Sequence, residues 1–411
     1  MYQGKTICSL ALLTFFVLIS TTVHASGFGV FTQGADALGQ ANATVAHTDG
    51  PSAVFFNPAL LTELTGTQIE IGTTAVIPKR KFKGDPSGVR EENEDTAYFP
   101  STLFLSHQIN DKLSAGLGVF NPFGLGTVWD SDWEGKTLAT KSRITTFNIN
   151  PSVAYRITPK ISVGAGLDIL LLDAKLKNKV PGLTAIDQKF TGDGEGVGYN
   201  AGLYIELNDR LSFGAAYRSE IKIDIDGKAE FDIPDALAGF SPLFPDTDGQ
   251  TSITLPQQVT AGLAYRFSPA WIVEAGLRWE DWESFDELTI ELEQPVAFAT
   301  SVTYPRNWHA TWAYNIGTKY RFNDRLALMA GYLYGQNPVP NSTFEPAIPD
   351  SDTHLFTVGT ELSFDHFKVA LAYGLQLQED RDKTTNEYGP IANGTYENTL
   401  HLAGVSITCA F

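Results

Sequence analysis

Residues 211–225 read LSFGAAYRSEIKIDI, and their side chains alternate between apolar and polar along most of the stretch. A period of two residues is typical of a β-strand whose two faces meet different surroundings. The faces are Leu211, Phe213, Ala215, Tyr217, Ile221, Ile223 and Ile225 on one side, and Ser212, Gly214, Arg218, Glu220, Lys222 and Asp224 on the other. Residues 367–378 alternate in the same way. A soluble β-sandwich shows this alternation too, so the strands alone do not decide the fold.

Tight polar turns recur outward from this stretch, each between two alternating segments. They are Asn110-Asp111, Thr158-Pro159, Asn208-Asp209, Ser268-Pro269, Asn323-Asp324 and Asp365-His366. These six hairpins supply twelve strands, and a first strand near 66–77 and a last strand near 399–411 bring the total to about fourteen. The remaining connections are long and polar, at roughly 79–97, 121–143, 174–195, 227–253, 293–305, 338–351 and 379–396.

This sorting of connections points to the fold class. Short turns on one rim and long loops on the other are typical of outer-membrane barrels, which in bacteria have an even number of strands. We therefore predict an all-β protein, in which residues 66–411 form a transmembrane antiparallel β-barrel of about 14 strands.

Residues 1–25 have the features of a secretory signal peptide. Lys5 stands near the start, an apolar run covers 7–20, and Val23-His24-Ala25 would form the cleavage site. The apolar run is shorter than the roughly 20 residues that a transmembrane helix needs. We expect the segment to be cleaved after export.

The balance of charges excludes one class of partner. The chain carries 29 Lys and Arg against 47 Asp and Glu, a formal net charge of −18, and loss of the signal with Lys5 would leave about −19. Nucleic acid requires a basic surface, so we expect no nucleic-acid partner. Loss of Cys8 with the signal leaves Cys409 alone, so no intrachain disulfide is expected.

Residues 26–64 read SGFGVFTQGADALGQANATVAHTDGPSAVFFNPALLTEL and differ in composition from everything that follows. Small residues surround a compact apolar cluster, Val54-Phe55-Phe56, and the stretch closes on Asn57-Pro58-Ala59. The Asn-Pro pair makes a stiff corner, whereas the glycines and alanines before it leave that arm adaptable. We interpret residues 26–65 as a small plug, or hatch, inside the barrel.

Aromatic residues near strand ends would form girdles at the membrane interfaces. They are Trp279, Trp282, Trp308, Trp312, Tyr314, Tyr332 and Tyr334. The chain ends in an alternating strand, 405–411, whose terminal Phe411 resembles the signal read by the outer-membrane assembly machinery, an expected partner. Cys409 would then face lipid as a small apolar residue.

Several motifs together carry a family resemblance. In the plug they are Gly27-Phe28, Gly39-Gln-Ala-Asn-Ala43, Asp49-Gly-Pro-Ser-Ala53 and Asn57-Pro58-Ala59; in the barrel they are Gly118-Val-Phe-Asn-Pro-Phe-Gly124, Phe147-Asn-Ile-Asn-Pro-Ser152, Leu255-Pro256 before Gly262-Leu-Ala-Tyr265, and Pro338-Val-Pro340 before Pro349-Asp-Ser-Asp352. The chain resembles the FadL-type outer-membrane transporters of long-chain fatty acids and other hydrophobic compounds, over essentially its whole mature length.

The resemblance implies a monomeric barrel in the outer membrane of a Gram-negative cell, with a hatch in its lumen. The hydrophobic small molecule would be captured outside, passed to an inner pocket and released through a gap in the barrel wall. It implies that Phe28 lies near the inner ligand and that Asn57, Pro58 and Ala59 shape the hatch. We add the plug residues Phe31, Phe55 and Phe56 as candidates for the same pocket.

Two further features are candidates for parts of this route. Apolar residues in long outer loops, which would form a capture groove, are Trp129, Trp133, Leu237, Phe240, Leu243 and Phe244, unless each loop buries its own. Asn121, Pro122 and Gly124 combine a missing N–H donor with a flexible glycine. They are a candidate kink in the wall, or only the start of the next loop.

Other functions remain as alternatives. A general porin would line its lumen with charges such as Arg218, Glu220, Lys222, Glu274, Arg278, Glu280 and Lys368. An outer-membrane lipase is least favoured, because the mature histidines stand far from any Ser or Asp motif and we expect no catalytic residues. No nucleotide-binding loop is present, so we expect passive, ligand-gated transport with no cofactor and no metal. The cargo stays open between fatty acids and hydrocarbons, aromatic ones included, and lipopolysaccharide and lipid are the expected surroundings.

Overall fold

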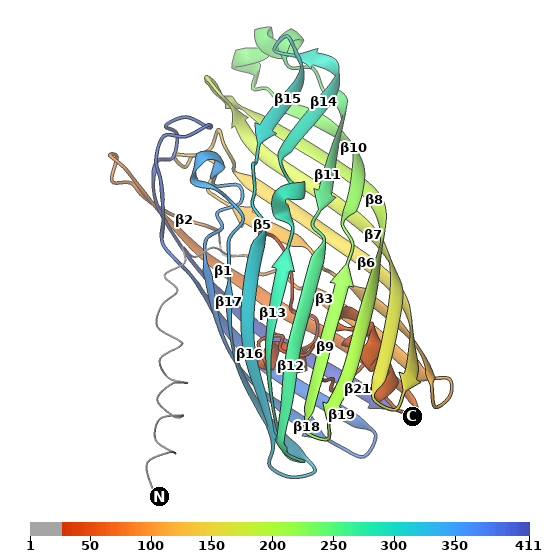
Figure 1. The fold of residues 1–411 in the computed structure, drawn as a ribbon. Helices are drawn as coiled ribbons and strands as arrows, with labels where there is room; N and C mark the ends of the chain where they lie inside the picture. Colours follow the sequence, from red (N-terminus) through yellow and green to blue (C-terminus); the bar gives the residue numbers. More distant parts are fainter. Residues whose placement is uncertain (1–26, 95) are drawn as a thin grey trace, which may run out of the picture.

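The structure is a computed structural model of the chain that describes residues 27–94 and 96–411 (Figure 1). The described chain forms a closed antiparallel β-barrel of 14 strands, which confirms the predicted fold class. The predicted signal peptide, residues 1–25, lies outside the described residues.

The strands and helices follow in chain order. They are α2 (Ala35–Gly39), α3 (Ala53–Phe56), the 3-10 helix η2 (Pro58–Glu63), β1 (Thr67–Gly84), β2 (Arg90–Glu92), β3 (Ser101–Gln108), β4 (Leu113–Phe120), β5 (Gly124–Val128), β6 (Lys141–Thr158), β7 (Ile161–Val180), β8 (Leu183–Asn208), β9 (Leu211–Arg218), β10 (Ile221–Asp232), η3 (Asp235–Leu243), β11 (Thr247–Leu255), β12 (Gln258–Ser268), β13 (Trp271–Glu280), η4 (Trp282–Ser284), β14 (Glu287–Val296), β15 (Ala299–Pro305), β16 (Thr311–Arg321), β17 (Leu326–Gly335), η5 (Asn341–Thr343), β18 (Thr353–Ser363), β19 (Phe367–Gln378), β20 (Arg381–Lys383) and β21 (Gly394–Ala410).

Five barrel strands are each divided into two pieces by a break, namely β4–β5, β9–β10, β11–β12, β13–β14 and β15–β16. The short strand β2 pairs with the end of β1, and the short strand β20 pairs with the start of β21. β1 and β21 close the barrel, pairing antiparallel from Gln68 and Ala410 to Gly84 and Gly394. Closure removes the free edges that an open sheet would expose.

The six predicted tight turns are confirmed. They connect β3 to β4, β6 to β7, β8 to β9, β12 to β13, β16 to β17 and β18 to β19, and they lie together at one rim of the barrel (Figure 1).

Two of the predicted long loops are wrong, and a third, 227–253, is strand at both ends, because β10 continues to Asp232 and β11 begins at Thr247. Residues 174–195 are mostly strand, because β7 and β8 continue outward and turn only at 181–182. Residues 293–305 form the β14–β15 hairpin, which turns at Ala297 and Phe298 with φ angles of 47° and 73°. Outside the membrane a strand can carry polar side chains on both faces, so polarity does not mark its end.

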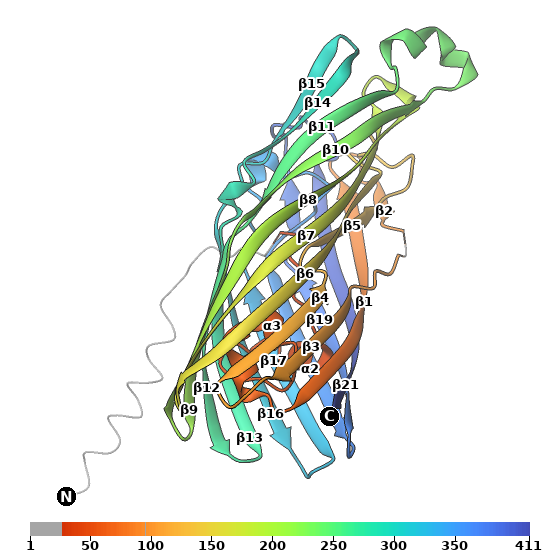
Figure 2. The same ribbon diagram turned by 90° about the vertical axis from the view of Figure 1, so that its right-hand side faces the viewer.

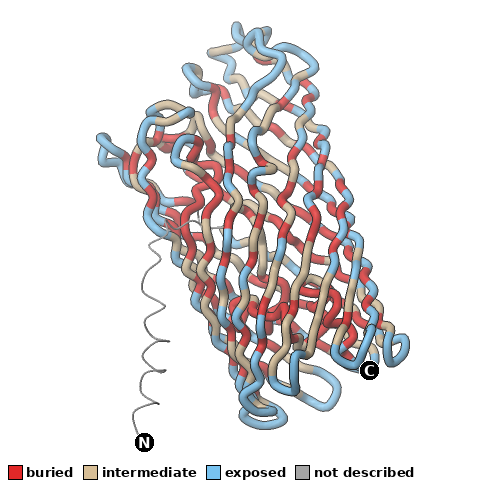
Figure 3. Tube along the Cα trace, in the orientation of Figure 1, coloured by how far each residue is buried: buried red, intermediate tan, exposed pale blue. Residues whose placement is uncertain are grey.

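Buried and exposed residues alternate along most strands (Figure 3). The outward face carries a belt of large exposed apolar side chains, as a lipid-facing wall requires. The belt includes Phe147, Ile149, Val153, Leu167, Ile169, Leu171, Val197, Tyr199, Leu263, Ile316, Leu328, Val358, Leu371 and Ile407. No helix among the described residues is long and apolar enough to cross a membrane.

The strand made of β9 and β10 exchanges its faces at its break. Arg218 is buried in the lumen, and Ile221 beyond the break is buried too. Between the rows Arg218–Asn200 and Asp224–Glu195 this strand holds one residue more than β8. One extra residue moves all following side chains to the other face. The prediction that Glu220 and Lys222 line the lumen is therefore wrong: both are exposed, and the Lys222 side chain is 66% exposed.

The helices α2, α3 and η2 lie inside the barrel (Figure 2). α2 packs against β17, β18, β19 and β21, whereas η2 packs against β6, β7 and β8. Leu38 of α2 is fully buried among leucines of one wall, and Leu60 and Leu61 of η2 are fully buried against Phe104 and Phe120 of another. This segment therefore crosses the lumen from wall to wall.

Asn57 fixes the corner between α3 and η2. Its side-chain oxygen accepts a hydrogen bond from Ala59 N at 3.1 Å, and Pro58 takes the first helical position, where a missing N–H costs nothing. Its amide nitrogen donates to Val45 O at 2.8 Å and to Leu203 O of β8 at 3.0 Å. One side chain thus caps a helix, joins two parts of the plug and ties both to the barrel wall.

Candidate transport pathway

Phe28 is enclosed by four aromatic side chains. Its ring centroid lies 4.7 Å from that of Trp282, 5.8 Å from Trp308 and 6.1 Å from both Phe123 and Phe285. Only 3% of Phe28 is exposed. Tilted and edge-to-face pairs of this kind contribute about 0.5–1.5 kcal/mol each beyond their buried area. The cage holds the start of the described chain inside the lumen.

Trp282 and Trp308 reach this cage because their strands are broken. Residues 281–286 interrupt β13–β14 and residues 306–310 interrupt β15–β16, and at both breaks a tryptophan turns inward. Both are buried, so the prediction that they belong to an interfacial girdle is wrong. Trp312, four residues further on, does face outward.

The barrel wall is also broken at residues 121–123. Phe120 pairs with Asn148 of β6 and Gly124 pairs with Thr145, so three residues of this strand face two of β6. Such a bulge bends the strand.

Asn121 bonds to both neighbouring strands at this bulge. Its side chain accepts a hydrogen bond from Ser101 N at 2.9 Å, and its amide donates to Thr146 O. The Asn121 side chain therefore links β3 to β6 at the break.

The N-terminal segment docks into this break. Val30 N donates to Pro122 O at 2.8 Å, Gly124 N donates to Phe28 O at 2.9 Å, and Gly29 forms an isolated bridge with Phe123. The segment therefore satisfies backbone groups that the interrupted strand leaves free.

An opening in the ladder extends outward from the break. The β3–β4 pairing ends at Leu103 and Val119, and β5 pairs with β6 but with no strand on its other side within 27–94 and 96–411. Further out, Glu94 N donates to Val128 O at 3.0 Å. Between these two points the wall is not held by strand pairing.

A cavity of about 420 Å³ occupies this region. Its lining includes Phe28 and Phe31 on the inside, and Phe99 and Phe147, which are 63% and 50% exposed, on the outside. Ligand pockets usually measure roughly 300–1,000 Å³. The cavity therefore has the size of a ligand site and runs from the lumen to the lipid-facing surface.

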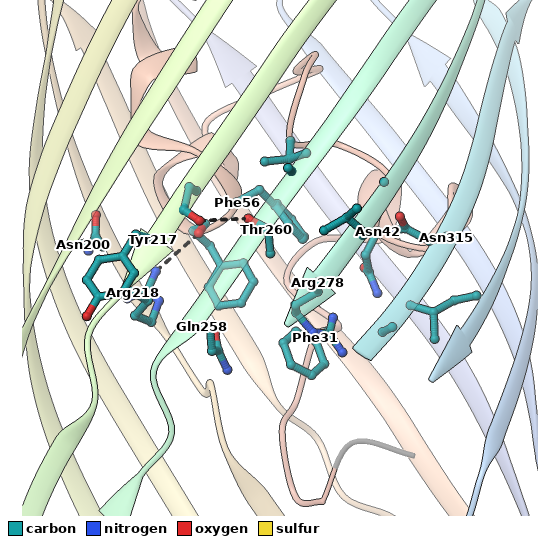
Figure 4. Close-up of a pocket in the computed structure, with 18 of the residues that line it drawn as sticks. Phe31, Asn42, Phe56, Asn200, Tyr217, Arg218, Gln258, Thr260, Arg278 and Asn315 are labelled. Atoms are coloured by element: carbon teal, nitrogen blue, oxygen red, sulfur yellow. Dashed lines mark hydrogen bonds between the residues drawn. The ribbon is translucent and has the colours of Figure 1, made fainter. Parts of the chain in front are cut away.

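A smaller cavity of about 60 Å³ lies deeper in the barrel (Figure 4). Phe55 and Phe56 line it, and Phe31 and Arg278 line both cavities. The Arg278 guanidinium lies 3.3 Å from the centroid of the Phe31 ring, and Figure 4 shows the two stacked. This cation–π pair therefore borders both cavities.

Two arginines that line the larger cavity have N–H groups without partners. Arg80 Nη1 donates to Gly126 O at 2.7 Å, and Arg278 Nε donates to Glu280 at 3.1 Å. Arg80 Nε and Arg278 Nη2 are buried and have no hydrogen-bond partner among the described residues. A buried donor without a partner costs about 1–3 kcal/mol. An anionic group in the cavity that came within hydrogen-bond distance of either donor would satisfy it.

Several other buried charges of the lumen are paired, some with the plug and some with each other. Lys319 lies 3.0 Å from Asp49 and 2.9 Å from Glu361. Glu274 accepts hydrogen bonds from Val45 N, Ala46 N and His47. Because these groups are buried, the contacts of Lys319 with Asp49 and of Glu274 with residues 45–47 are expected to stabilise the plug in its place.

Asp350, in the loop before β18, holds the first described residue. Its carboxylate accepts hydrogen bonds from Gly27 N at 2.8 Å and from Gln378 Nε2 at 2.9 Å. Burial raises the pKa of Asp350 to about 7, although both hydrogen bonds oppose the shift.

The candidate groove residues form two separate groups. Trp129 and Trp133 stack at 4.6 Å and are buried, with Phe82 and Tyr396 beside them. Leu237, Leu243 and Phe244 pack in another cluster, against the tips of β7 and β8, and Phe240 beside them is 37% exposed. The structure does not bring the two groups together.

Known proteins share the fold of this chain. Residues 16–411 match the family described as outer membrane protein transport protein (OMPP1/FadL/TodX). The chain belongs to this family. The barrel accordingly lies in the outer membrane, as predicted from the sequence.

Curated relatives of this FadL-family chain include the long-chain fatty acid transport proteins of Salmonella typhi and of Escherichia coli strain K12. They are 27% and 25% identical to it, and each alignment covers 98% of both sequences.

Solved structures of the FadL family share the fold. A FadL homologue of Pseudomonas aeruginosa superposes with a TM-score of 0.84 at 22% identity, over 94% of this chain and 100% of that one. The toluene transporter TodX of Pseudomonas putida gives 0.75 at 22% identity, over 94% and 99%.

Proposed function

We propose that the chain is a passive outer-membrane channel for hydrophobic molecules, with long-chain fatty acids as its main cargo. The observation that carries the proposal is the cavity of about 420 Å³, which connects the aromatic cage around Phe28 with the outward-facing Phe99 and Phe147. An apolar molecule gains about 25 cal/mol for each Å² of surface removed from water. A path that leads from an aromatic pocket to lipid keeps that surface dry throughout.

The proposed route has three stages. Outer loops capture the molecule, with Phe240 as the exposed member of the candidate groove. The plug segment around Phe28 and Phe31 then shifts, because a ligand that binds better to a shifted arrangement raises the population of that arrangement. The molecule finally leaves sideways through the unpaired wall between β3 and β5. We propose a monomeric barrel, in which no neighbouring subunit covers this part of the wall.

The unpartnered N–H groups of Arg80 and Arg278 favour a carboxylate over a neutral hydrocarbon. A hydrogen bond to a charged group contributes about 1.5–3 kcal/mol. The curated relatives named for long-chain fatty acids agree with this choice. Toluene transporters such as TodX have the same fold, so an uncharged cargo is the second candidate.

The lateral exit is tested with Ser101→Trp. Ser101 is exposed, lines the cavity and stands at its outer mouth, so an indole there should cover the opening. We expect uptake of labelled fatty acid into proteoliposomes to fall roughly tenfold, as for a barrier raised by about 1.4 kcal/mol. Leu103→Trp, two residues along the same outward face, is the matched control. Equal uptake by both variants would contradict the lateral exit.

The cargo is tested with Arg80→Met and Arg278→Met, each assayed by binding of a fatty acid and of an alkane of equal length. Fatty acid binding should weaken roughly 10- to 100-fold from the loss of a charged hydrogen bond, whereas alkane binding should change little. Lys81→Met is the control, since Lys81 neighbours Arg80 but is 60% exposed. If both ligands weaken equally, the arginines do not select a carboxylate.

A further inference from the structure

We propose that five basic side chains on the outer surface of β6, β7 and β8 bind the phosphorylated headgroup of lipopolysaccharide. The basic cluster consists of Lys141, Arg143, Lys175, Lys177 and Lys189. The inference requires only that the barrel lies in the outer membrane, and does not depend on which cargo it carries.

Strand pairing places these residues side by side. Arg143 is directly opposite Lys175, and Lys141 is directly opposite Lys177. Lys177 is in turn opposite Lys189 on β8. Directly opposed residues in an antiparallel pair have Cβ atoms about 4.5–5.5 Å apart. The five charges therefore form one compact patch.

The patch faces away from the lumen. Leu170 and Leu172 of β7 are buried inside, whereas Leu167 and Leu171 are exposed on the lipid-facing side. Alternation along the strand gives Lys175 and Lys177 the same outward direction as Leu171. On β6, Arg143 shares its face with Phe147 in the same way.

The patch also lies at the right height. Arg143 is four residues beyond Phe147, the last large apolar residue of the belt on β6, which is about 13 Å along the strand. At a strand tilt of about 40° this is about 10 Å along the membrane normal. It lies on the side of the long loops, where headgroup sugars and phosphates of the outer leaflet would surround the barrel.

The charges of the patch are not neutralised within the described chain. Lys189 pairs with Glu230 at 2.5 Å, but Lys141, Arg143, Lys175 and Lys177 have no carboxylate within 4.0 Å among the described residues. Like charges directly opposite each other destabilise a sheet. Asp173, two residues from Lys175 on the same face, offsets part of this repulsion, and an external anion would offset the rest.

The neighbouring strand shows the contrast. On the same outward surface of β10, Lys222 lies 3.3 Å from Asp224, and Lys228 is two residues from both Asp226 and Glu230. Each lysine there lies between acids of the same face, whereas Lys175 has the acid Asp173 on one side only and Lys177 on the other. Lys222 and Lys228 supply a matched control.

The test compares Lys175→Gln/Lys177→Gln with Lys222→Gln/Lys228→Gln. Each purified protein is titrated in detergent with rough lipopolysaccharide that keeps its phosphates, and retained lipid is counted by native mass spectrometry. The first variant should bind roughly tenfold more weakly, given the usual contribution of basic residues near an anionic membrane surface. The control and Lys175→Arg/Lys177→Arg should bind as wild type.

Two results would overturn the proposal. Wild-type affinity in Lys175→Gln/Lys177→Gln would show that the patch does not hold the lipid, and equal binding of enzymatically dephosphorylated lipopolysaccharide would show that phosphate is not what is recognised. A fold check by heat-dependent gel migration accompanies every variant, and the arginine variant separates loss of charge from loss of structure.

Discussion

At the scale of single residues, the hydrogen bond from Gly27 N to the Asp350 carboxyl group is expected to depend on pH. Burial raises the pKa of Asp350 to about 7 from 3.8. A carboxyl group whose pKa is raised on folding favours the folded state fully below about pH 4, and this contribution is lost as the pH rises through about 7.

We therefore predict that Asp350→Asn is more stable than wild type above pH 7, by at most a few kcal/mol, and equal to it below pH 4. Gln378 can turn its amide to accept a hydrogen bond from the new Asn. Melting temperatures across about pH 3–8 measure the difference. Burial also raises the pKa of Asp352 to about 7. Because Asp352 is present in both wild type and Asp350→Asn, its effect on stability cancels when the two proteins are compared. A difference that does not vary with pH would contradict the prediction.

The roles of some single residues could be predicted from the sequence, and those of others could not. Asn57-Pro58 was interpretable as a stiff corner because the restrictions on proline and its preceding residue are local. The role of Trp282 and Trp308 was not, since it depends on strand breaks that turn both side chains inward. The orphan donors of Arg80 and Arg278 likewise appear only when the burial of each N–H is known.

At the scale of elements, glycines of the wall let the plug backbone approach closely. A Cβ on Gly164 of β7 would lie 2.5 Å from Ala59 N, and a Cβ on Gly331 of β17 would lie 2.6 Å from Ala41 N. These atoms belong to the plug backbone, which cannot move aside as a flexible side chain would.

Gly164→Ala and Gly331→Ala should therefore displace the plug, at a cost of about 1–3 kcal/mol for overpacking. We expect ion leakage in planar bilayers to rise in both variants. Gly239→Ala in η3 is the control, because nothing lies within 4 Å of its added methyl group. Conductance as low as in wild type for both wall variants would argue against a tight plug.

The strands show where sequence patterns succeed and fail. The tight turns were predictable because each depends on a few adjacent residues. The exchange of faces between β9 and β10 was not, since the single extra residue at the break leaves both halves alternating normally. The length of β7 and β8 beyond the membrane was missed because their outer halves are polar.

At the scale of the whole molecule, the plug and the charge pairs around it fill the lumen and leave no wide aqueous pore among the described residues. Of the charges expected to line a porin, Glu220 and Lys222 face outward, and others bind the plug or each other, as Glu274 with His47 and Arg278 with Glu280 do. The larger cavity leads to the wall and not straight through the barrel. The account therefore depends on movement of the N-terminal segment at the wall break.

A disulfide between Val30→Cys and Gly124→Cys, in a Cys409→Ser background, tests that movement most directly. A Cβ on Gly124 would lie 3.2 Å from Val30 Cγ2, so the two thiols are within reach of each other. Each single-cysteine variant is the control. We predict that the oxidised protein takes up no fatty acid and that reduction restores uptake, whereas equal uptake by the oxidised and reduced forms would contradict the account.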